Sequence, residues 1–244
     1  VVFMFPGQGG QYINMGRTLY EREAPFRQAM DLCLDYYFQL TSVDLSALIY
    51  PLDSSVTATQ DRTAINDTGV SQPLLFMLEY ALSRLLMSRA IVPTLMIGYS
   101  FGEYAAACIA GVFSYREALD LIAVRARLMQ KMPAGGMIST SLPLEQLTPL
   151  LSGSLAIAID NPGTCVVGGL EADIAALTQT LQSKRCFCFP VDISHIAHSP
   201  LLQQIVPEFI AALRQVDLQP PQLPYVSNVT GQVVTAAQAT DVDF

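Results

Sequence analysis

A serine held between two glycines, at the junction of an apolar run and a run of small residues, constrains this chain most. Residues 93–97 are largely apolar and predict a central strand, Gly98-x-Ser100-x-Gly102 follows, and residues 103–110 have a helical pattern. Glycines on both sides permit a sharp strand-to-helix turn that exposes the serine hydroxyl beside a helix N-terminus. The pattern favours an α/β fold and makes Ser100 a candidate nucleophile for acyl transfer.

A serine becomes a strong nucleophile only when a base takes its proton. The chain has two histidines, His195 and His198, three residues apart. Both lie far downstream of Ser100, which is the nucleophile-before-base order of α/β acyl-transfer enzymes. If Ser100 is catalytic, one of them is the base; the residues alone leave open which one, and also leave open a structural role for either.

The first half of the chain predicts a strand followed by helices. Residues 1–5 predict a buried strand that leads into the glycine-rich segment 6–10, and residues 12–40 have helical patterning. Ser71 is placed to cap a helix that runs to about residue 90, with Pro73 in its first turn. Ser114 and Glu117 form a capping box for a helix that ends near residue 131.

After residue 133 the pattern changes to short alternating elements. The expected order is strand, helix, strand, strand, helix, strand, over residues 137–142, 144–151, 155–160, 164–168, 171–183 and 186–191. This order is the ferredoxin-like arrangement. We therefore expect a hydrolase-like parallel-sheet subdomain, formed by residues 1–132 and 192–244, with a ferredoxin-like βαββαβ subdomain inserted at residues 133–191. A loop at residues 219–224 precedes a last strand at 225–227.

Composition limits the classes of partner and location. Apolar residues make up 51% of the 244 residues and charged residues 14%, below the roughly 25% of an average domain, so we expect neighbouring domains to cover part of the surface. A net charge of −8 argues against nucleic acid. The most apolar helix, residues 74–90, is interrupted by Glu79, Arg84 and Arg89, which argues against a membrane span. No signal peptide is visible at Val1, and a cytoplasmic location is expected.

The cysteines predict neither disulfides nor a metal site. Five are present, and Cys186 and Cys188 are expected to point to opposite faces of their strand, which suits neither a disulfide nor zinc. We expect reduced thiols in apolar surroundings and no metal.

Six motifs in one order resemble the malonyl-CoA:acyl carrier protein transacylase family and, within it, the acyltransferase domains of modular polyketide synthases. The resemblance covers almost the entire chain. The motifs are Phe5-Pro6-Gly7-Gln8-Gly9-Gly10-Gln11, Gln72-Pro73, Gly98-Tyr99-Ser100-Phe101-Gly102-Glu103, Val124-Arg125-Ala126-Arg127-Leu128-Met129-Gln130, Asn161-Pro162 and His195-Ile196-Ala197-His198-Ser199-Pro200.

The resemblance implies a role for each of these motifs. Ser100 would be the nucleophile, His198 the general base, and Gln8 with the backbone N–H of Phe101 the oxyanion hole. Arg125 would grip the free carboxylate of the substrate in two parallel hydrogen bonds. Gln72 and Asn161 would either orient the site or cap local backbone, and His195 and Ala197 would select the substrate. Gln8 as a turn residue and Arg125 as a solvated helix charge remain alternatives.

The same resemblance implies an acyltransferase that moves a malonyl-type extender from coenzyme A to Ser100, and then to the phosphopantetheine thiol of an acyl carrier protein. Such a domain would serve polyketide chain extension in secondary metabolism, beside other synthase domains of the same polypeptide, and would carry no cofactor of its own.

Three departures from the family pattern bear on this interpretation. Tyr99 stands where the family usually has histidine. Ala197 stands where malonyl-specific members have phenylalanine, which implies a larger pocket, whereas the bulk of Phe101 implies a smaller one. The chain ends before the family's C-terminal helical segment, whose backbone orients the histidine.

A serine thioesterase or acyl hydrolase would use the same serine and histidine but deliver the acyl group to water. Asp160 or Asp192 could then complete a triad. Arg125 argues against this alternative, because a hydrolase of simple acyl chains needs no carboxylate clamp. A non-catalytic docking domain is disfavoured because nucleophile, base, oxyanion donor and clamp are all present.

Overall fold

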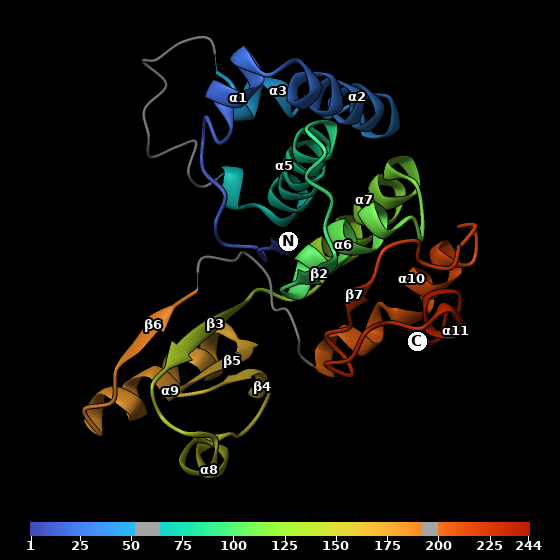
Figure 1. Cartoon of the computed structure of the whole chain (residues 1–244). Helices are drawn as coiled ribbons and strands as arrows, with labels where there is room; N and C mark the ends of the chain where they lie inside the picture. The colour runs from blue at the N-terminus through green and yellow to red at the C-terminus, as the bar shows by residue number, and fades with distance from the viewer. Residues whose placement is uncertain (52–63, 192–199) are drawn as a thin grey trace. The chain divides into compact units, whose positions relative to one another are not determined.

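The computed structural model describes residues 1–51, 64–191 and 200–244, which form a mixed α/β protein. The chain folds into two compact units (Figure 1). Unit 1 comprises Val1–Ala126 and Phe209–Phe244, and unit 2 comprises Arg127–Glu208. Unit 2 includes the whole segment 133–191 that was expected to be an insertion, and extends beyond it at both ends.

Unit 1 is built on a parallel sheet of strand order β1-β2-β7. Its strands are β1 (Val2–Phe5), β2 (Leu95–Gly98) and β7 (Tyr225–Val226). The prediction that β2 is a central strand is confirmed. The prediction of a buried first strand is only half right, because Phe3 and Phe5 are buried whereas Val2 and Met4 are exposed. Within the described chain, β1 pairs with another strand on one side only, so it lies at the edge of the sheet. Because alternate side chains of a strand point to opposite faces, every second residue of β1 is exposed.

Unit 1 also contains helices, and two of them continue into unit 2. The helical stretch predicted at residues 12–40 breaks at Glu23, which has extended backbone and precedes Pro25 at the start of the next helix. The capping box predicted at Ser114 is confirmed, with Ser114 N–H to Glu117 Oε2 at 2.7 Å and Glu117 N–H to Ser114 Oγ at 3.3 Å. The elements are α1 (Arg17–Arg22), α2 (Ala24–Thr41), α3 (Ser46–Ile49), α5 (Thr68–Ser88), the 3-10 turn η1 (Ser100–Gly102), α6 (Glu103–Ala110), α7 (Tyr115–Gln130), α10 (Val206–Leu213) and α11 (Ala236–Ala239). The 3-10 turn η3 (Pro200–Gln204) lies in unit 2.

The start of α5 differs from the prediction. Asp67, not Ser71, caps the helix by accepting the Gly69 N–H at 2.7 Å, so Pro73 lies inside the helix. A proline at this position removes the hydrogen bond to the carbonyl four residues earlier, which is that of Gly69. The Tyr37 hydroxyl of α2 donates to this carbonyl at 3.4 Å and compensates for the loss. Ser71 is therefore available for a contact with another part of the chain.

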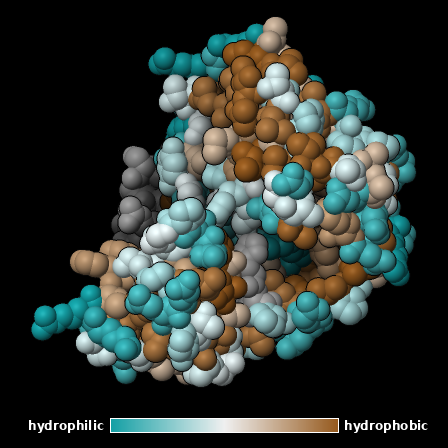
Figure 2. Space-filling view, turned by 60° about the horizontal axis from the view of Figure 1, so that its bottom comes forward, coloured by the Kyte–Doolittle hydropathy of each residue, from teal (hydrophilic) through white to brown (hydrophobic). Residues whose placement is uncertain are grey.

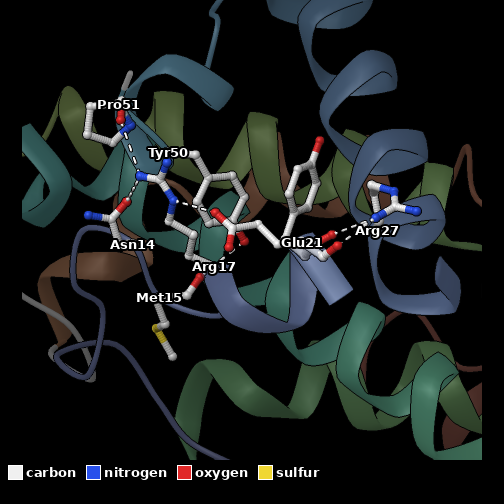
Figure 3. Close-up of polar contacts among 8 residues, drawn as sticks. Asn14, Met15, Arg17, Glu21, Arg27, Tyr50 and Pro51 are labelled. Carbon is white, nitrogen blue, oxygen red and sulfur yellow. Dashed lines mark hydrogen bonds and ion pairs between the residues drawn. The ribbon is translucent and has the colours of Figure 1, made fainter. Parts of the chain in front are cut away.

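Hydrogen bonds hold the segment between the glycine-rich loop and α2 in place (Figure 3). The guanidinium of Arg17 donates to Glu21 Oε1 at 2.9 Å and to Asn14 Oδ1 at 3.0 Å. The Tyr50 hydroxyl donates to the carbonyl of Met15 at 3.1 Å, and Asn14 N–H donates to the carbonyl of Ile49 at 2.8 Å. These hydrogen bonds fix the position of the segment that follows Gln8 in the sequence.

Unit 2 contains an antiparallel sheet of order β4-β5-β3-β6 with α9 (Glu171–Ser183) packed on it, and the predicted ferredoxin-like order of elements is confirmed. The other elements are β3 (Gly135–Thr140), α8 (Leu144–Leu147), η2 (Thr148–Leu150), β4 (Ala156–Asn161), β5 (Thr164–Leu170) and β6 (Cys188–Pro190). The predicted helix at 144–151 is shorter because Pro149 cannot donate a helical hydrogen bond. Val191 N–H donates to the carbonyl of Met137 at 2.9 Å, so the chain leaves this sheet beside its entry strand.

The cysteines are reduced as predicted, since all five are free thiols. The expectation that Cys186 and Cys188 face opposite ways was wrong. Both pack against the same apolar core as Ile138 and Leu181, because residues two apart on an extended chain share a face.

Apolar side chains also reach the surface. Met4 is 77% exposed and Leu82 is 42% exposed. Figure 2 shows apolar patches on the face that it draws. The low charged fraction of the sequence thus reflects exposed apolar surface as well as the core. Among the helices that the structure describes, none combines the length and the apolar character needed to cross a bilayer.

Glu79 is a carboxyl group inside the core. It is 7% exposed on α5, and neither of its carboxyl oxygens has a hydrogen-bond partner in the described chain. Burial without a partner penalises the charged form and raises the pKa of Glu79 well above its usual range. The folded state therefore binds this proton more tightly than the unfolded chain does.

We predict that Glu79→Gln removes a pH-dependent loss of stability. The free energy of unfolding of the parent protein should fall as pH rises above the ordinary carboxyl pKa, by about 1.4 kcal/mol per pH unit until the folded pKa is reached. The variant lacks this titration, so its advantage over the parent should grow from pH 4 to pH 8 in urea unfolding. The exposed Glu21→Gln variant is the control, and a Glu79→Gln difference that is constant with pH would contradict the prediction.

Candidate active site

Ser100 lies on a tight turn between β2 and α6, as the sequence predicts. Its backbone is left-handed, with φ 52°, a conformation that costs free energy for a residue with a side chain. The flanking glycines leave no room for a side chain. A Cβ at Gly98 would collide with the backbone of Glu103, and one at Gly102 would lie 2.7 Å from the carbonyl oxygen of Pro6. The turn therefore needs glycine at both positions.

The backbone N–H groups of this turn are almost all engaged. Tyr99 N–H donates to the carbonyl of Phe5 at 2.8 Å, and Gly102 N–H donates to that of Tyr99 at 3.0 Å. Ser100 N–H donates to Asn228 Oδ1 at 3.2 Å. The Phe101 N–H has no acceptor in residues 1–51, 64–191 and 200–244. It is thus the backbone donor of the turn that a ligand can use.

Gln8 lies in the glycine-rich loop, and its side chain is turned toward α5. Its Nε2 donates to Ser71 Oγ at 2.6 Å and to Thr68 Oγ1 at 3.5 Å, and its Oε1 accepts from Gln72 Nε2 at 3.3 Å. The side-chain amide is therefore engaged, whereas the backbone N–H of Gln8 has no acceptor in the described part of the chain. This loop touches the serine turn, since a Cβ at Gly7 would lie 3.5 Å from Ser100 Cβ.

Arg125 lies on α7 and reaches toward the serine turn. Its guanidinium carbon is 5.7 Å from the centre of the Phe101 ring. Its Nη1 atom is buried, and no group of the described chain accepts a hydrogen bond from it. The pKa of the nearby Tyr104 is raised by burial and partly lowered by the charge of Arg125. Arg125 is therefore not a fully solvated helix charge.

The structure does not bring every predicted site residue together. Asn161 is the last residue of β4, in unit 2, and the structure describes this unit separately from the unit that holds Ser100. His195, Ala197 and His198 lie outside the described residues. Gln72, on α5, contacts Gln8, whose loop lies beside Ser100.

Asn228 and Glu103 were missed as partners of the serine turn. Asn228 Nδ2 donates to the carbonyl of Gly98 at 2.8 Å and to Glu103 Oε2 at 2.6 Å. The backbone N–H of Asn228 donates to Glu103 Oε1 at 3.2 Å. Burial raises the pKa of Glu103, and these hydrogen bonds partly oppose the shift. A signal was available, because Asn228 closely follows the last predicted strand, and adjacent parallel strands end at one edge of a sheet.

Comparison with known proteins decides the family. A family model described as "Acyl transferase domain" matches residues 2–242. The chain belongs to the acyl transferase domain family. Among curated relatives, a phenolphthiocerol/phthiocerol polyketide synthase protein of Mycobacterium tuberculosis is 35% identical over 242 residues, which cover 99% of the chain and 16% of that protein. The orsellinic acid synthase armB of Armillaria mellea is 34% identical over 96% of the chain and 11% of that protein.

Solved structures agree with this assignment. The acyl transferase domain of ZmaA is 38% identical, with a TM-score of 0.86, over 99% of this chain and 56% of that one. The acyl transferase domain of SpnD is 34% identical, with a TM-score of 0.88, over 99% of this chain and 57% of that one. The predicted α/β fold and the predicted acyltransferase class are both confirmed. The chain spans about a sixth of the length of the mycobacterial relative.

We predict that Gly102→Ala destabilises the protein, because the new Cβ would collide with the carbonyl oxygens of Phe5 and Pro6. Overpacking of this kind costs about 1–3 kcal/mol. Gly10→Ala is the matched control, since a Cβ at Gly10 meets nothing within 4 Å. In urea unfolding the control should stay within about 0.5 kcal/mol of the parent. Equal stability of the two variants would show that the serine turn is not packed tightly against the end of β1.

Proposed function

We propose that this acyl transferase domain moves a malonyl-type extender from coenzyme A to Ser100, and then to the phosphopantetheine thiol of an acyl carrier protein, within a polyketide synthase. The observation that carries the proposal is the buried, unpartnered Nη1 of Arg125 close to Phe101. The family and its polyketide synthase relatives support acyl transfer in general, and Arg125 supports the choice of a carboxylated acyl group.

A buried guanidinium N–H without an acceptor is costly, and a carboxylate relieves that cost better than any neutral group. The planar fork of arginine can hold a carboxylate in two parallel hydrogen bonds. An acetyl group would leave the same N–H unpaired. Two relatives support this choice: the acyl transferase domain of SpnD was solved in complex with 2-(pent-4-yn-1-yl)malonyl, and an acyl carrier protein S-malonyltransferase from Vibrio cholerae is 25% identical with a TM-score of 0.82.

In the proposed reaction, Ser100 Oγ attacks the thioester carbonyl while His198 takes the serine proton. Negative charge develops on the carbonyl oxygen, where we place the backbone N–H groups of Phe101 and Gln8. Collapse of the intermediate expels the coenzyme A thiolate, which takes the proton from His198, and leaves the acyl group on Ser100. The carrier thiol then attacks the ester by the same steps, with its proton passing to His198 and back to Ser100.

The extender's substituent is set, in this proposal, by His195, Ala197 and Phe101. A small residue at Ala197 favours a roomier pocket, and the ring of Phe101 limits it from another side. Gln72 is proposed to hold the Gln8 loop through its side chain, and the role of Asn161 stays a prediction from the sequence. The carrier protein and other synthase domains are the proposed partners, and no cofactor of the domain itself is proposed.

We predict that malonyl-CoA acylates Ser100, and that Ser100→Ala abolishes the mass increase in intact-protein mass spectrometry. Ser42→Ala is the matched control, because Ser42 is an exposed serine that shares with Ser100 a positive φ, here 61°. This control should be acylated as the parent is. Acylation of the Ser100→Ala protein would refute the assignment of Ser100 as the nucleophile. Release of malonate without transfer to carrier protein would indicate an acyl hydrolase.

We predict that Arg125→Ala inverts the preference for malonyl over acetyl groups. Loss of one partner of a buried ion pair costs about 3–5 kcal/mol, so kcat/KM for malonyl-CoA should fall by about 100-fold or more. Transfer of acetyl should hold or rise, because the unpaired guanidinium is gone. Arg127→Ala is the control, since Arg127 is exposed and paired with Glu208 at 3.0 Å. An equal drop for both substrates would make Arg125 a structural residue.

A further inference from the structure

Asn228 makes hydrogen bonds to both sides of the serine turn. Its Oδ1 accepts the N–H of Ser100, and its Nδ2 donates to the carbonyl of Gly98, at 3.2 and 2.8 Å. One amide therefore bonds to Gly98, the last residue of β2, and to Ser100 within the turn. An asparagine side chain supplies an acceptor and two donors at once, which neither aspartate nor alanine can reproduce.

Glu103 completes this arrangement from the first turn of α6. Its Oε2 accepts the second Nδ2 hydrogen of Asn228 at 2.6 Å, and its Oε1 accepts the backbone N–H of Asn228 at 3.2 Å. Asn228 is itself held by the turn after β7, where the buried Ser227 Oγ accepts the N–H groups of Val229 and Thr230 at 3.0 and 3.4 Å. The hydrogen bonds of Asn228 and Glu103, which we call the brace, thus link the ends of β2 and β7 to the start of α6.

The brace determines which backbone N–H of the turn can face a substrate. Ser100 N–H is bonded to Asn228, and Gly102 N–H is bonded to Tyr99. Within the described residues this leaves Phe101 N–H to donate outward. Ser100 also has a left-handed backbone, with φ 52°, which persists only where surrounding contacts enforce it.

We propose that Asn228 is a positioning residue for acyl transfer, which together with Glu103 holds Ser100 and the Phe101 N–H in the geometry of the reaction. This inference rests on the proposed function, because it takes Ser100 as the nucleophile. Asn228 acts through the turn and does not touch the acyl group. Its loss should slow the acylation step while leaving the binding of malonyl-CoA nearly unchanged.

The test measures Ser100 acylation by rapid quench and intact mass over a series of malonyl-CoA concentrations, using the full chain. Asn228→Ala should lower the limiting acylation rate by about 10- to 100-fold, the range expected for a misplaced reacting group. The half-saturating concentration should change by less than about threefold, as expected when binding contacts are intact. Val229→Ala is the control on the same loop, since Val229 is 75% exposed, and it should behave as the parent does.

A pair of conservative variants separates positioning from mere folding. Asn228→Asp places two carboxylates side by side and should be at least as slow as Asn228→Ala. Adding Glu103→Gln restores a donor and an acceptor between these two positions, and should recover at least about threefold of the lost rate. A double variant no faster than Asn228→Asp would overturn the inference, and so would a loss of rate that only follows a loss of folded protein.

Acylation of the parent protein distinguishes failure of the proposed function from failure of this inference alone. A parent that malonyl-CoA does not acylate at Ser100 overturns the proposed function and this inference with it. An acylated parent with an equally fast Asn228→Ala variant overturns this inference alone.

Discussion

The contact between the end of β1 and the serine turn is the constraint on which the rest of this site depends. Backbone lies directly on backbone there, because Gly102 carries no side chain and Tyr99 N–H bonds to the carbonyl of Phe5. The same contact brings the Gln8 loop beside Ser100. A loop and a turn from distant parts of the sequence are thus held together through backbone contacts, which favours a preorganised site.

The first turns of α5 support this contact from the other side. Thr68, Ser71 and Gln72 are buried polar residues on a helix that is otherwise largely apolar. A buried hydroxyl or amide needs a partner, and the side chain of Gln8 supplies one to each of these three residues. The helix can therefore bury its polar start because it faces a polar loop and not the core.

Local patterns predicted much of the fold, whereas contacts distant in sequence escaped prediction. The serine turn and the Ser114 capping box were predictable because their determinants lie within about ten residues of one another. The cap of α5 was misplaced because Asp67 and Ser71 are both good caps, and Tyr37 lets Pro73 lie inside the helix in a way that no local rule anticipates. Asn228 is 128 residues from Ser100, and only the pairing of β2 with β7 brings the two together. The two histidines lie outside the described residues, so their assignment stays a prediction.

The hydrogen bond between Val191 and Met137 bears on how this fold tolerates change. Unit 2 begins its sheet on β3 and ends it on the neighbouring β6, so the two ends of the sheet segment are pinned together from within. For the rest of the chain, these residues act as one closed loop whose ends are already joined. The entropy of loop closure then depends little on what lies between them. Lengthening or replacing the hairpin of unit 2 should therefore leave the folding of unit 1 almost unaffected, and selection can vary the small unit while the unit that bears Ser100 stays constant.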